Sequence, residues 1–366
     1  MTTSASPPGQ APSRETLCPY CLEPIGFDER QLFVRDDRQQ YAALDLSTQN
    51  SPLRRADTLR SAYQRCRNTD GVPQHYIPAP YLTHGDPLTV AMVGDSATGK
   101  THLLTQMIAE IIDGGLERYG ITWQSVNPQD HRVFIEEHVT RLRSGRMLEH
   151  TPPESFASFV AALLLSGPDG STRPVAFFDL SGEDLRRTDA MLRFMLGVDA
   201  LVFVVDPLRA VPLPHLDPLR GELGLASGGD PAFQTVLDRL PRSGPYHGVA
   251  AAVVINKSDL LRFEPPVDRW LAEPPPARLS ATKLRDESRD AYAFLRHHCG
   301  PAWVQPFDGV LRCTLHFASA TGSHGHKDSF PHGTRPRRVL EPLVSVLSMC
   351  GVLGDAGGDG PGAVGM

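Results

Sequence analysis

The chain has 366 residues, and its 36 Lys and Arg stand against 42 Asp and Glu, which gives a formal net charge of −6. This acidity argues against a nucleic-acid-binding protein that works by neutralising phosphates. The sequence has no run of about 18 apolar residues, its first residues lack the hydrophobic core of a signal peptide, and its six cysteines are sparse. We therefore expect a cytoplasmic protein with reduced thiols and no membrane attachment.

Composition divides the chain into four parts. Residues 1–17 are rich in Ser, Thr, Pro and Gly, which predicts disorder. Residues 18–85 are polar, Arg-rich and start with Cys-Pro-Tyr-Cys, which is typical of an appendage. Residues 86–350 carry the apolar runs of a folded domain, and the Gly-rich residues 351–366 predict a disordered tail.

Strand-like and helix-like stretches alternate through the folded part. Apolar runs predict strands at 88–93, 200–206, 248–255 and 311–319, and a stretch with helical spacing follows the first of them. Two further runs, SFVAALLLS and RPVAFFDL, are joined by GPDG and predict a hairpin. This alternation predicts an α/β fold with a mostly parallel sheet, covered on both faces, and one antiparallel edge strand.

The loop after the first strand carries a specific motif. It fits the pattern G-x-x-x-x-G-K-[ST] with Gly94, Asp95, Ser96, Ala97, Thr98, Gly99, Lys100 and Thr101. Glycines let backbone N–H groups wrap phosphates, and the helix N-terminus adds partial positive charge. The pattern predicts that Lys100 contacts the β- and γ-phosphates and that Thr101 ligates Mg²⁺. Arginine does not replace such a lysine, and this chain otherwise uses Arg for nearly all its cations.

Two later motifs also follow apolar strands. Asp179 ends one run and precedes Gly182, which predicts a Mg²⁺ contact from the carboxylate and a γ-phosphate contact from the glycine N–H. The motif N-K-S-D contains Asn256, Lys257 and Asp259. Its carboxylate can accept two hydrogen bonds from the N1–H and N2–H₂ edge of guanine, an edge that adenine lacks. Asn256 can tie the base to the phosphate loop, and the Lys257 stem can cover the ring.

The last strand ends in a possible fourth contact to the nucleotide. Ser319, Ala320 and Thr321 stand where a backbone N–H can meet the guanine O6. By itself such a segment is an ordinary exit from a strand. Its position after the other three motifs is what favours a role in base recognition.

With these motifs in order, residues 86–350 resemble the translation-factor-related (TRAFAC) class of P-loop GTPases. The resemblance implies the three-layer sandwich of P-loop NTPases and a switch I threonine that completes the shell of Mg²⁺ and the γ-phosphate. Thr151 is the candidate because it lies just ahead of SFVAALLL, whereas Thr140 lies within a predicted helix. Glu183 stands where many Ras-like members carry Gln after the D-x-x-G glycine. Slow or partner-activated hydrolysis, with Gly182 and Glu183 beside the attacking water, follows as a hypothesis.

A narrower likeness involves the string DLSGEDL and the N-terminal cysteines, which look like those of bacterial double-GTPase (DO-GTPase) proteins. Members of that family often carry an N-terminal zinc ribbon and are thought to act in multi-gene signalling or conflict systems. Cys18 and Cys21 form one zinc knuckle, but a second C-x-x-C is missing. Cys66 with His75 or His84 would supply further ligands at a spacing that matches no usual template. A Zn²⁺ site and a vestigial knuckle without metal both stay open.

Three functions compete. The leading hypothesis is a GTP-binding switch that hydrolyses GTP to GDP with Mg²⁺ and signals through nucleotide-dependent binding of protein partners. The alternative is a catalytically weak, GTP-bound scaffold, which Glu183 favours. An ATP-using kinase or ATPase would require N-K-S-D to be accidental. The sequence names no partner.

Overall fold

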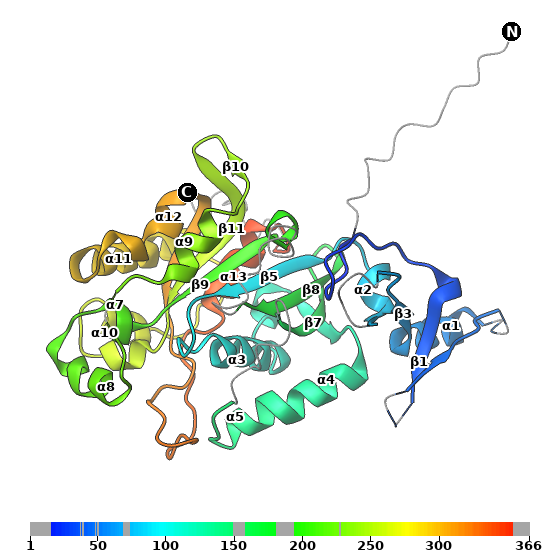
Figure 1. The fold of residues 1–366 in the computed structure, drawn as a ribbon, viewed down its shortest axis with the longest axis horizontal. Helices are drawn as coiled ribbons and strands as arrows, with labels where there is room; N and C mark the ends of the chain where they lie inside the picture. Colours follow the sequence, from blue (N-terminus) through cyan, green and yellow to red (C-terminus); the bar gives the residue numbers. More distant parts are fainter. Residues whose placement is uncertain are drawn as a thin grey trace, which may run out of the picture.

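The computed structural model describes residues 16–353, except for 37, 39, 48, 50, 69–73, 149–157, 181–193 and 227. It contains an eight-stranded sheet and a separate four-stranded sheet, which Figure 1 shows side by side. The disorder predicted for residues 1–17 and 351–366 concerns positions nearly all of which lie outside the described residues.

The eight-stranded sheet has the strand order β10-β11-β9-β5-β8-β7-β6, and β12 pairs with β11. Its strands are β5 (Leu88–Val93), β6 (Thr122–Ser125), β7 (Ser158–Ser166), β8 (Thr172–Asp179), β9 (Ala200–Val205), β10 (Arg242–Ser243), β11 (Tyr246–Ile255) and β12 (Val310–Phe317). The helices around it are α3 (Lys100–Ile112), α4 (Pro128–Phe134), α5 (Arg141–Arg143), α7 (Pro207–Ala210), α8 (Asp217–Glu222), α9 (Pro231–Leu237), α10 (Val267–Ala272), α11 (Ala281–His298), α12 (Gln305–Gly309) and α13 (Glu341–Met349).

The pairing in this sheet is mixed, so the predicted mostly parallel sheet of a P-loop NTPase sandwich is wrong. The pairs β12–β11, β11–β9, β9–β5 and β5–β8 are parallel, whereas β10–β11, β8–β7 and β7–β6 are antiparallel. The prediction allowed for one antiparallel edge strand and overlooked two short strands, Thr122–Ser125 and Arg242–Ser243. Both are polar, so they lack the apolar run by which a sequence reveals a buried strand.

Both faces of the large sheet are buried. Along β5, Val90 and Met92 pack on one face with residues of α3 and α13, and Ala91 and Val93 pack on the other face with residues of α9. Side chains of a strand alternate between the two faces, so a strand covered on both sides needs apolar residues throughout. All residues of β9 are accordingly buried. This continuous core fixes the strand ends that carry the predicted motifs.

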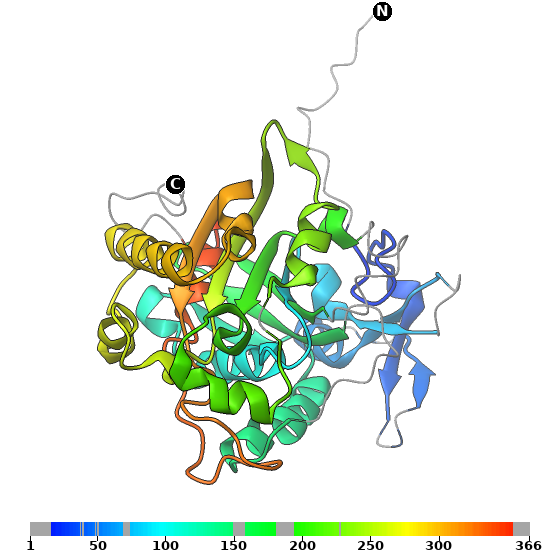
Figure 2. The ribbon, with the colours of Figure 1, turned by 60° about the vertical axis from the view of Figure 1, so that its left-hand side comes forward.

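The N-terminal residues form the second sheet, with strand order β2-β1-β3-β4 and antiparallel neighbours. Its elements are β1 (Leu32–Arg35), β2 (Tyr41–Ala43), β3 (Tyr63–Arg65), β4 (Tyr76–Pro78), α1 (Pro52–Ser61) and α2 (Ala79–Thr83). A small cluster of Leu32, Leu46, Ala62 and Ala79 forms a core of its own. Figures 1 and 2 both place this unit at one side of the large sheet. Short strands in a polar, Arg-rich segment gave no recognisable pattern, so this sheet also went unpredicted.

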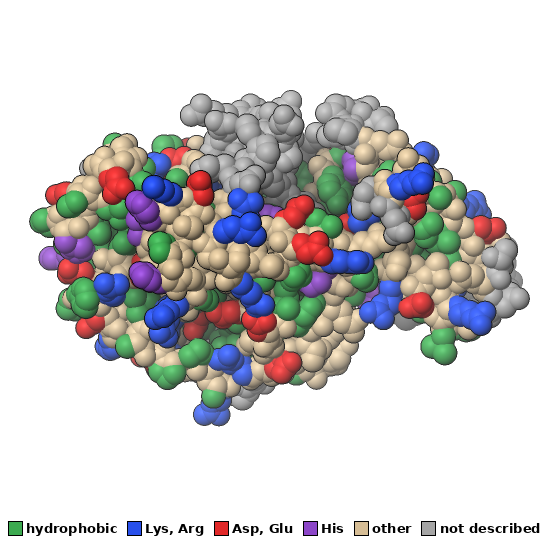
Figure 3. All heavy atoms as spheres, turned by 90° about the horizontal axis from the view of Figure 1, so that it is seen from below, with side chains coloured by type: hydrophobic (Ala, Val, Ile, Leu, Met, Phe, Trp, Pro, Cys, Tyr) green, Lys and Arg blue, Asp and Glu red, His purple; other side chains and the backbone are tan. Residues whose placement is uncertain are grey.

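Where Figure 3 colours the described residues, acidic and basic side chains are interspersed on this face. Within the described ranges, no helix combines the length and the apolarity that crossing a membrane requires.

Candidate nucleotide and metal sites

The loop between β5 and α3 has a conformation that depends on glycine. Gly99 has a φ of +83°, and a Cβ on this residue would lie 2.7 Å from the amide Nδ2 of Asn256. A Cβ on Gly94 would lie 3.0 Å from the carbonyl oxygen of Val204, the penultimate residue of β9. Side chains at these positions would collide with the neighbouring strand ends, and glycine avoids the collision. The loop therefore lies against the ends of β9 and β11.

Lys100 is buried at the start of α3, with 7% of its surface exposed. Its Nζ donates to the carbonyl oxygens of Gly94 at 2.7 Å and Asp95 at 2.8 Å, so the side chain curls back into the loop. A compact ammonium at a helix N-terminus, beside loop N–H groups, concentrates positive charge in one place. This arrangement suits an anionic phosphate.

Two residues outside the predicted motifs hold the same loop in place. Asp230 Oδ2 accepts a hydrogen bond from the N–H of Asp95 at 2.8 Å, and Arg209 pairs with the Asp95 carboxylate at 2.7 Å. Within the loop, Ser96 N–H donates to Asp95 Oδ1 and the Thr98 hydroxyl donates to the Asp95 carbonyl. Arg209 belongs to α7 and Asp230 caps α9, so no local motif announced either residue.

Thr101 and Asp179 lie together, as a shared Mg²⁺ site requires. The Thr101 hydroxyl donates to Asp179 Oδ2 at 2.5 Å. The other carboxylate oxygen, Oδ1, is buried and lacks a hydrogen-bond partner among the described residues. A buried carboxylate oxygen without a partner costs free energy unless a cation or a donor satisfies it. Oxygen ligands of this kind are the ones Mg²⁺ uses beside phosphates, so these two residues fit the ion.

The amide of Asn256 connects the predicted base site to the phosphate loop. Its Nδ2 donates to the carbonyl oxygen of Thr98 at 3.1 Å, and its Oδ1 accepts from the N–H of Ala320 at 3.2 Å. Beside it, the carboxylate of Asp259 accepts a hydrogen bond from the Ser319 hydroxyl at 2.5 Å. Three motifs that are far apart in the sequence therefore meet at the carboxyl ends of β5, β11 and β12.

Lys257 makes a second connection to the phosphate loop. Its Nζ donates to the Ala97 carbonyl at 2.8 Å and to Asp206 Oδ2 at 2.6 Å. Asp206 directly follows β9 and is fully buried. These two bonds hold the Lys257 ammonium between the phosphate loop and the end of β9. Asp206 was visible in the sequence only as the last residue of an apolar run.

The structure leaves some predicted residues without a test. Thr151, Gly182 and Glu183 lie outside the described residues, so their roles stay predictions. The alternative switch residue, Thr140, ends the helical segment Ile135–Thr140. Thr321 lies beside the base motif, where its hydroxyl donates to the Ser323 carbonyl at 2.9 Å.

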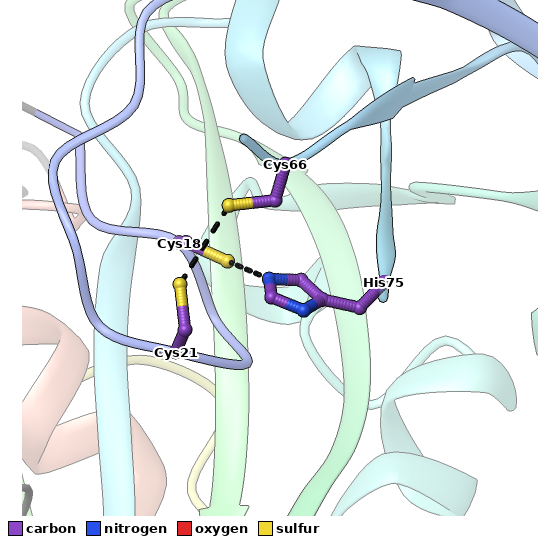
Figure 4. Close-up of side chains that lie close together, drawn as sticks. All are labelled: Cys18, Cys21, Cys66 and His75. Atoms are coloured by element: carbon purple, nitrogen blue, oxygen red, sulfur yellow. Dashed lines mark hydrogen bonds between the residues drawn. The ribbon is translucent and has the colours of Figure 1, made fainter. Parts of the chain in front are cut away.

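A cluster of three cysteines and one histidine lies in the N-terminal unit, as Figure 4 shows. The ligand atoms of Cys18, Cys21, Cys66 and His75 all lie within 4.8 Å of one another. The Sγ atoms of Cys21 and Cys66 are 3.6 Å apart, and Cys18 Sγ is 3.1 Å from His75 Nε2. His84 is not part of this cluster; its Nδ1 lies 3.0 Å from the Pro80 carbonyl oxygen.

Strand pairing explains why Cys66 and His75 meet. In the antiparallel pair β3–β4, Arg65 lies opposite Tyr76, so the next pair of positions is Cys66 and His75. The N–H of Cys66 donates to the His75 carbonyl at 3.1 Å. The knuckle of Cys18 and Cys21 then packs over this pair. Sequence spacing alone permits either His75 or His84, because it does not specify the strand register that brings His75 beside Cys66.

The chemistry of the cluster suits a thiophilic cation. A tetrahedral zinc with Zn–S bonds of about 2.3 Å holds its sulfurs about 3.8 Å apart, close to the Cys21–Cys66 separation. The hydrogen bond from Cys18 lowers the pKa of Cys21 to about 4, whereas burial raises the pKa of Cys18 and of Cys66. A bound cation would stabilise the remaining thiolates. The chain thus contains a possible Cys₃His metal-binding cluster.

Two comparisons with known proteins assign this chain to no family. A scan against protein-family models finds no match, and a search of curated proteins finds none either.

Proposed function

We propose that the chain binds GTP with Mg²⁺ and acts as a switch that hydrolyses GTP to GDP and binds protein partners in a nucleotide-dependent way. The observation that carries the proposal is the pair of hydrogen bonds made by Asn256, which joins the phosphate loop at Thr98 to the base motif at Ala320. One amide thereby sets the distance between the phosphate end and the base end of a nucleotide. The resemblance to TRAFAC GTPases supports the same assignment.

Each part of the nucleotide has a matching group. Lys100 and the loop N–H groups would bind the phosphates, and Thr101 with Asp179 would hold Mg²⁺, which neutralises charge on the phosphate oxygens when bound. Asp259 would accept hydrogen bonds from the N1–H and N2–H₂ edge of guanine. Catalysis would come from positioning and from charge neutralisation, because phosphoryl transfer asks little covalent chemistry of the protein.

Nucleotide competition tests the guanine assignment. We expect unlabelled GTP and GDP to displace a fluorescent mant-GTP, and ATP at equal concentration to leave it bound. ATP lacks the donor edge that Asp259 would bind, so its failure to compete is the direct consequence of base recognition. Equal displacement by ATP would instead favour an ATP-using enzyme.

Hydrolysis needs a separate measurement. Single-turnover phosphate release from GTP in the presence of Mg²⁺, compared with a sample in EDTA, distinguishes a GTPase from a GTP-bound scaffold. We expect slow release that depends on Mg²⁺, because Glu183 would place a carboxylate near the γ-phosphate. Protein that purifies with intact GTP and releases no phosphate would support the scaffold. Pull-down with GTPγS-loaded against GDP-loaded protein would then identify the partners.

For the Cys₃His cluster we propose Zn²⁺ as the bound ion. Three sulfur ligands and one imidazole form a donor set that zinc takes up in structural sites. Cys18, Cys21 and Cys66 lie in the core cluster that also covers one face of the large sheet, so a metal would tie the N-terminal unit to that core and add to its folding free energy. Metal analysis of the purified chain should find about one zinc per molecule, and its absence would favour a vestigial knuckle.

A further inference from the structure

The segment that would contact the guanine O6 is one arm of a hairpin. Ser319 and Arg337 exchange two backbone hydrogen bonds of 2.9 and 2.8 Å, and the N–H of Arg335 donates to the Thr321 carbonyl at 2.8 Å. Gly322 turns the chain with a φ of +71°, and a Cβ there would lie 2.3 Å from the Arg335 carbonyl oxygen. The second arm, residues 335–337, therefore pairs with the first arm, residues 319–321, and fixes its position.

One buried carboxylate secures both ends of this arrangement. Glu287 of α11 accepts the N–H of Phe317, the last residue of β12, on Oε1 at 3.1 Å. On Oε2 it pairs with the Arg338 guanidinium at 2.7 Å and accepts from His316 Nδ1 at 3.0 Å. Phe317 leads into Ser319, and Arg338 follows the second arm. Glu287 thus fixes the residues on either side of the hairpin without touching the base site.

The environment of Glu287 makes its charge essential to these contacts. Its side chain is 1% exposed and that of Arg338 is 7% exposed. Arg338 also has a φ of +53°, stacks over Trp270 at 5.3 Å and lies 3.9 Å from Glu341. Burial alone would raise the pKa of Glu287, but His316 and Arg338 hold it below the usual value. Neutralising the carboxylate would leave a buried guanidinium poorly paired, and the second arm would lose its anchor.

We propose that Glu287 is a positioning residue for guanine recognition: through Phe317 and Arg338 it holds the Ser319–Thr321 segment where a backbone N–H meets the 6-oxo group of the base. This inference rests on the proposed GTP binding. It adds a residue of α11 that no nucleotide motif contains. It also gives a reason why Glu287, His316 and Arg338 are buried together next to the end of β12, within a mostly apolar core.

Three triphosphates separate this role from a merely structural one. GTP and ITP carry the 6-oxo group, whereas 2-aminopurine riboside triphosphate lacks it and keeps the exocyclic amine. For Glu287→Gln we expect the Kd of GTP and of ITP to rise about fivefold, the scale of one hydrogen bond. The Kd of the 2-aminopurine nucleotide should change less than about twofold, because this base lacks the oxygen that the N–H of the segment would meet and keeps only its amine contact to Asp259, which the hairpin holds through the Ser319 hydroxyl alone. Asp286→Asn is the matched control, since it removes an exposed carboxylate from the same helix.

Each remaining outcome decides against the inference. An equal loss of affinity for all three nucleotides would mean that Glu287 only stabilises the fold. No loss of affinity would mean that the hairpin keeps its position without Glu287. If Glu287→Gln does not fold, Gly322→Ala disturbs the same hairpin from its turn and should give the same selective loss. Wild-type protein that fails to prefer GTP over ATP would refute the proposed function first, so the two failures are distinguishable.

Discussion

Two candidate sites are assembled in opposite ways. One is the nucleotide edge, formed by residues 94–101, 256–259 and 319–321, and the other is the Cys₃His cluster. Motifs at the nucleotide edge are short continuous segments at the ends of strands with an apolar core on both faces. Their side chains already bond to one another and to backbone, as Asn256 and Lys257 do. The proposed metal ligands come from a loop and from the ends of two short strands, and the three cysteines lie in a core cluster that they share with one face of the large sheet. The nucleotide would therefore bind a scaffold that exists without it, whereas the metal would be part of its scaffold.

Removing a metal ligand should have the largest effect. We expect Cys66→Ser to abolish zinc binding and to make residues 16–83 sensitive to limited proteolysis, because structural zinc contributes about 10 kcal/mol to comparable small units. Affinity for mant-GTP should stay within about threefold, since α3, which begins at the phosphate loop, packs on the face of the sheet opposite the cysteines. The control is Cys350→Ser, a cysteine outside the cluster. Retained zinc, or an unchanged cleavage pattern, would remove the distinction between the two regions.

The converse change should weaken nucleotide binding and leave the fold and the metal cluster intact. Lys100→Ala deletes the ammonium that would bind the phosphates, and hydrogen bonds to charged groups contribute about 1.5–3 kcal/mol each. We expect the Kd of mant-GTP to rise about 100-fold, with the zinc content and the thermal midpoint close to those of the wild type. Lys283→Ala, which removes an exposed lysine of α11 paired with Glu273, serves as the control. Comparable losses in both variants would argue against a phosphate site at Lys100.

A smaller and more specific change tests the base end. Asp259→Asn replaces one acceptor oxygen by a donor, which suits the N1–H and O2 edge of xanthine better than guanine. We expect GTP affinity to fall about 30-fold and XTP affinity to rise, so that the preference inverts. Competition by GTP and XTP against a mant nucleotide measures both changes. The Asp259–Ser319 hydrogen bond is lost or weakened as well, so a uniform loss for both nucleotides would show that Asp259 acts on the loop instead.

The same contrast explains how far sequence reasoning reached. The phosphate loop, N-K-S-D and Ser319–Thr321 each follow an apolar strand, so continuous patterns located the residues that the structure brings together. The Cys66–His75 pair depends on the register of a polar hairpin, which no local pattern specifies. Similarly, the mixed pairing of the large sheet arises from strands such as Thr122–Ser125 that are too short and polar to recognise. Supporting residues were missed for another reason.

Those supporting residues contact segments that are far away from them in the sequence. Arg209, Asp230 and Glu287 come from helices or their caps and contact segments more than 100, more than 130 and about 30 positions away along the chain. Helical periodicity identifies the buried face of a helix, but it does not say which strand end a carboxylate on that face will meet. Charged residues inside a core are uncommon unless paired. Their partners become visible only when the chain is folded.

The mildest test uses pH to separate the two regions. Burial raises the pKa of Glu110, on α3, to about 7, and Glu341 adds to the effect. The folded state therefore holds a proton on this carboxyl that the unfolded chain releases near its ordinary pKa of 4.5. Stability from this group is complete below that value and is lost as the pH rises through about 7, at a cost of about 3 kcal/mol.

Urea denaturation at pH 5 and pH 8 measures this term. Glu110→Gln should raise the free energy of unfolding at pH 8 and flatten the difference between the two pH values, because the amide carries no charge to bury. Glu117→Gln, an exposed neighbour in the same stretch, should leave the difference unchanged. Treatment with a chelator should not alter the Glu110 term either, since Glu110 lies on α3, whose buried residues pack on the face of the sheet opposite the cysteines. A pH dependence that disappears on chelation would place its origin in the Cys₃His unit and would show that the two regions are not independent.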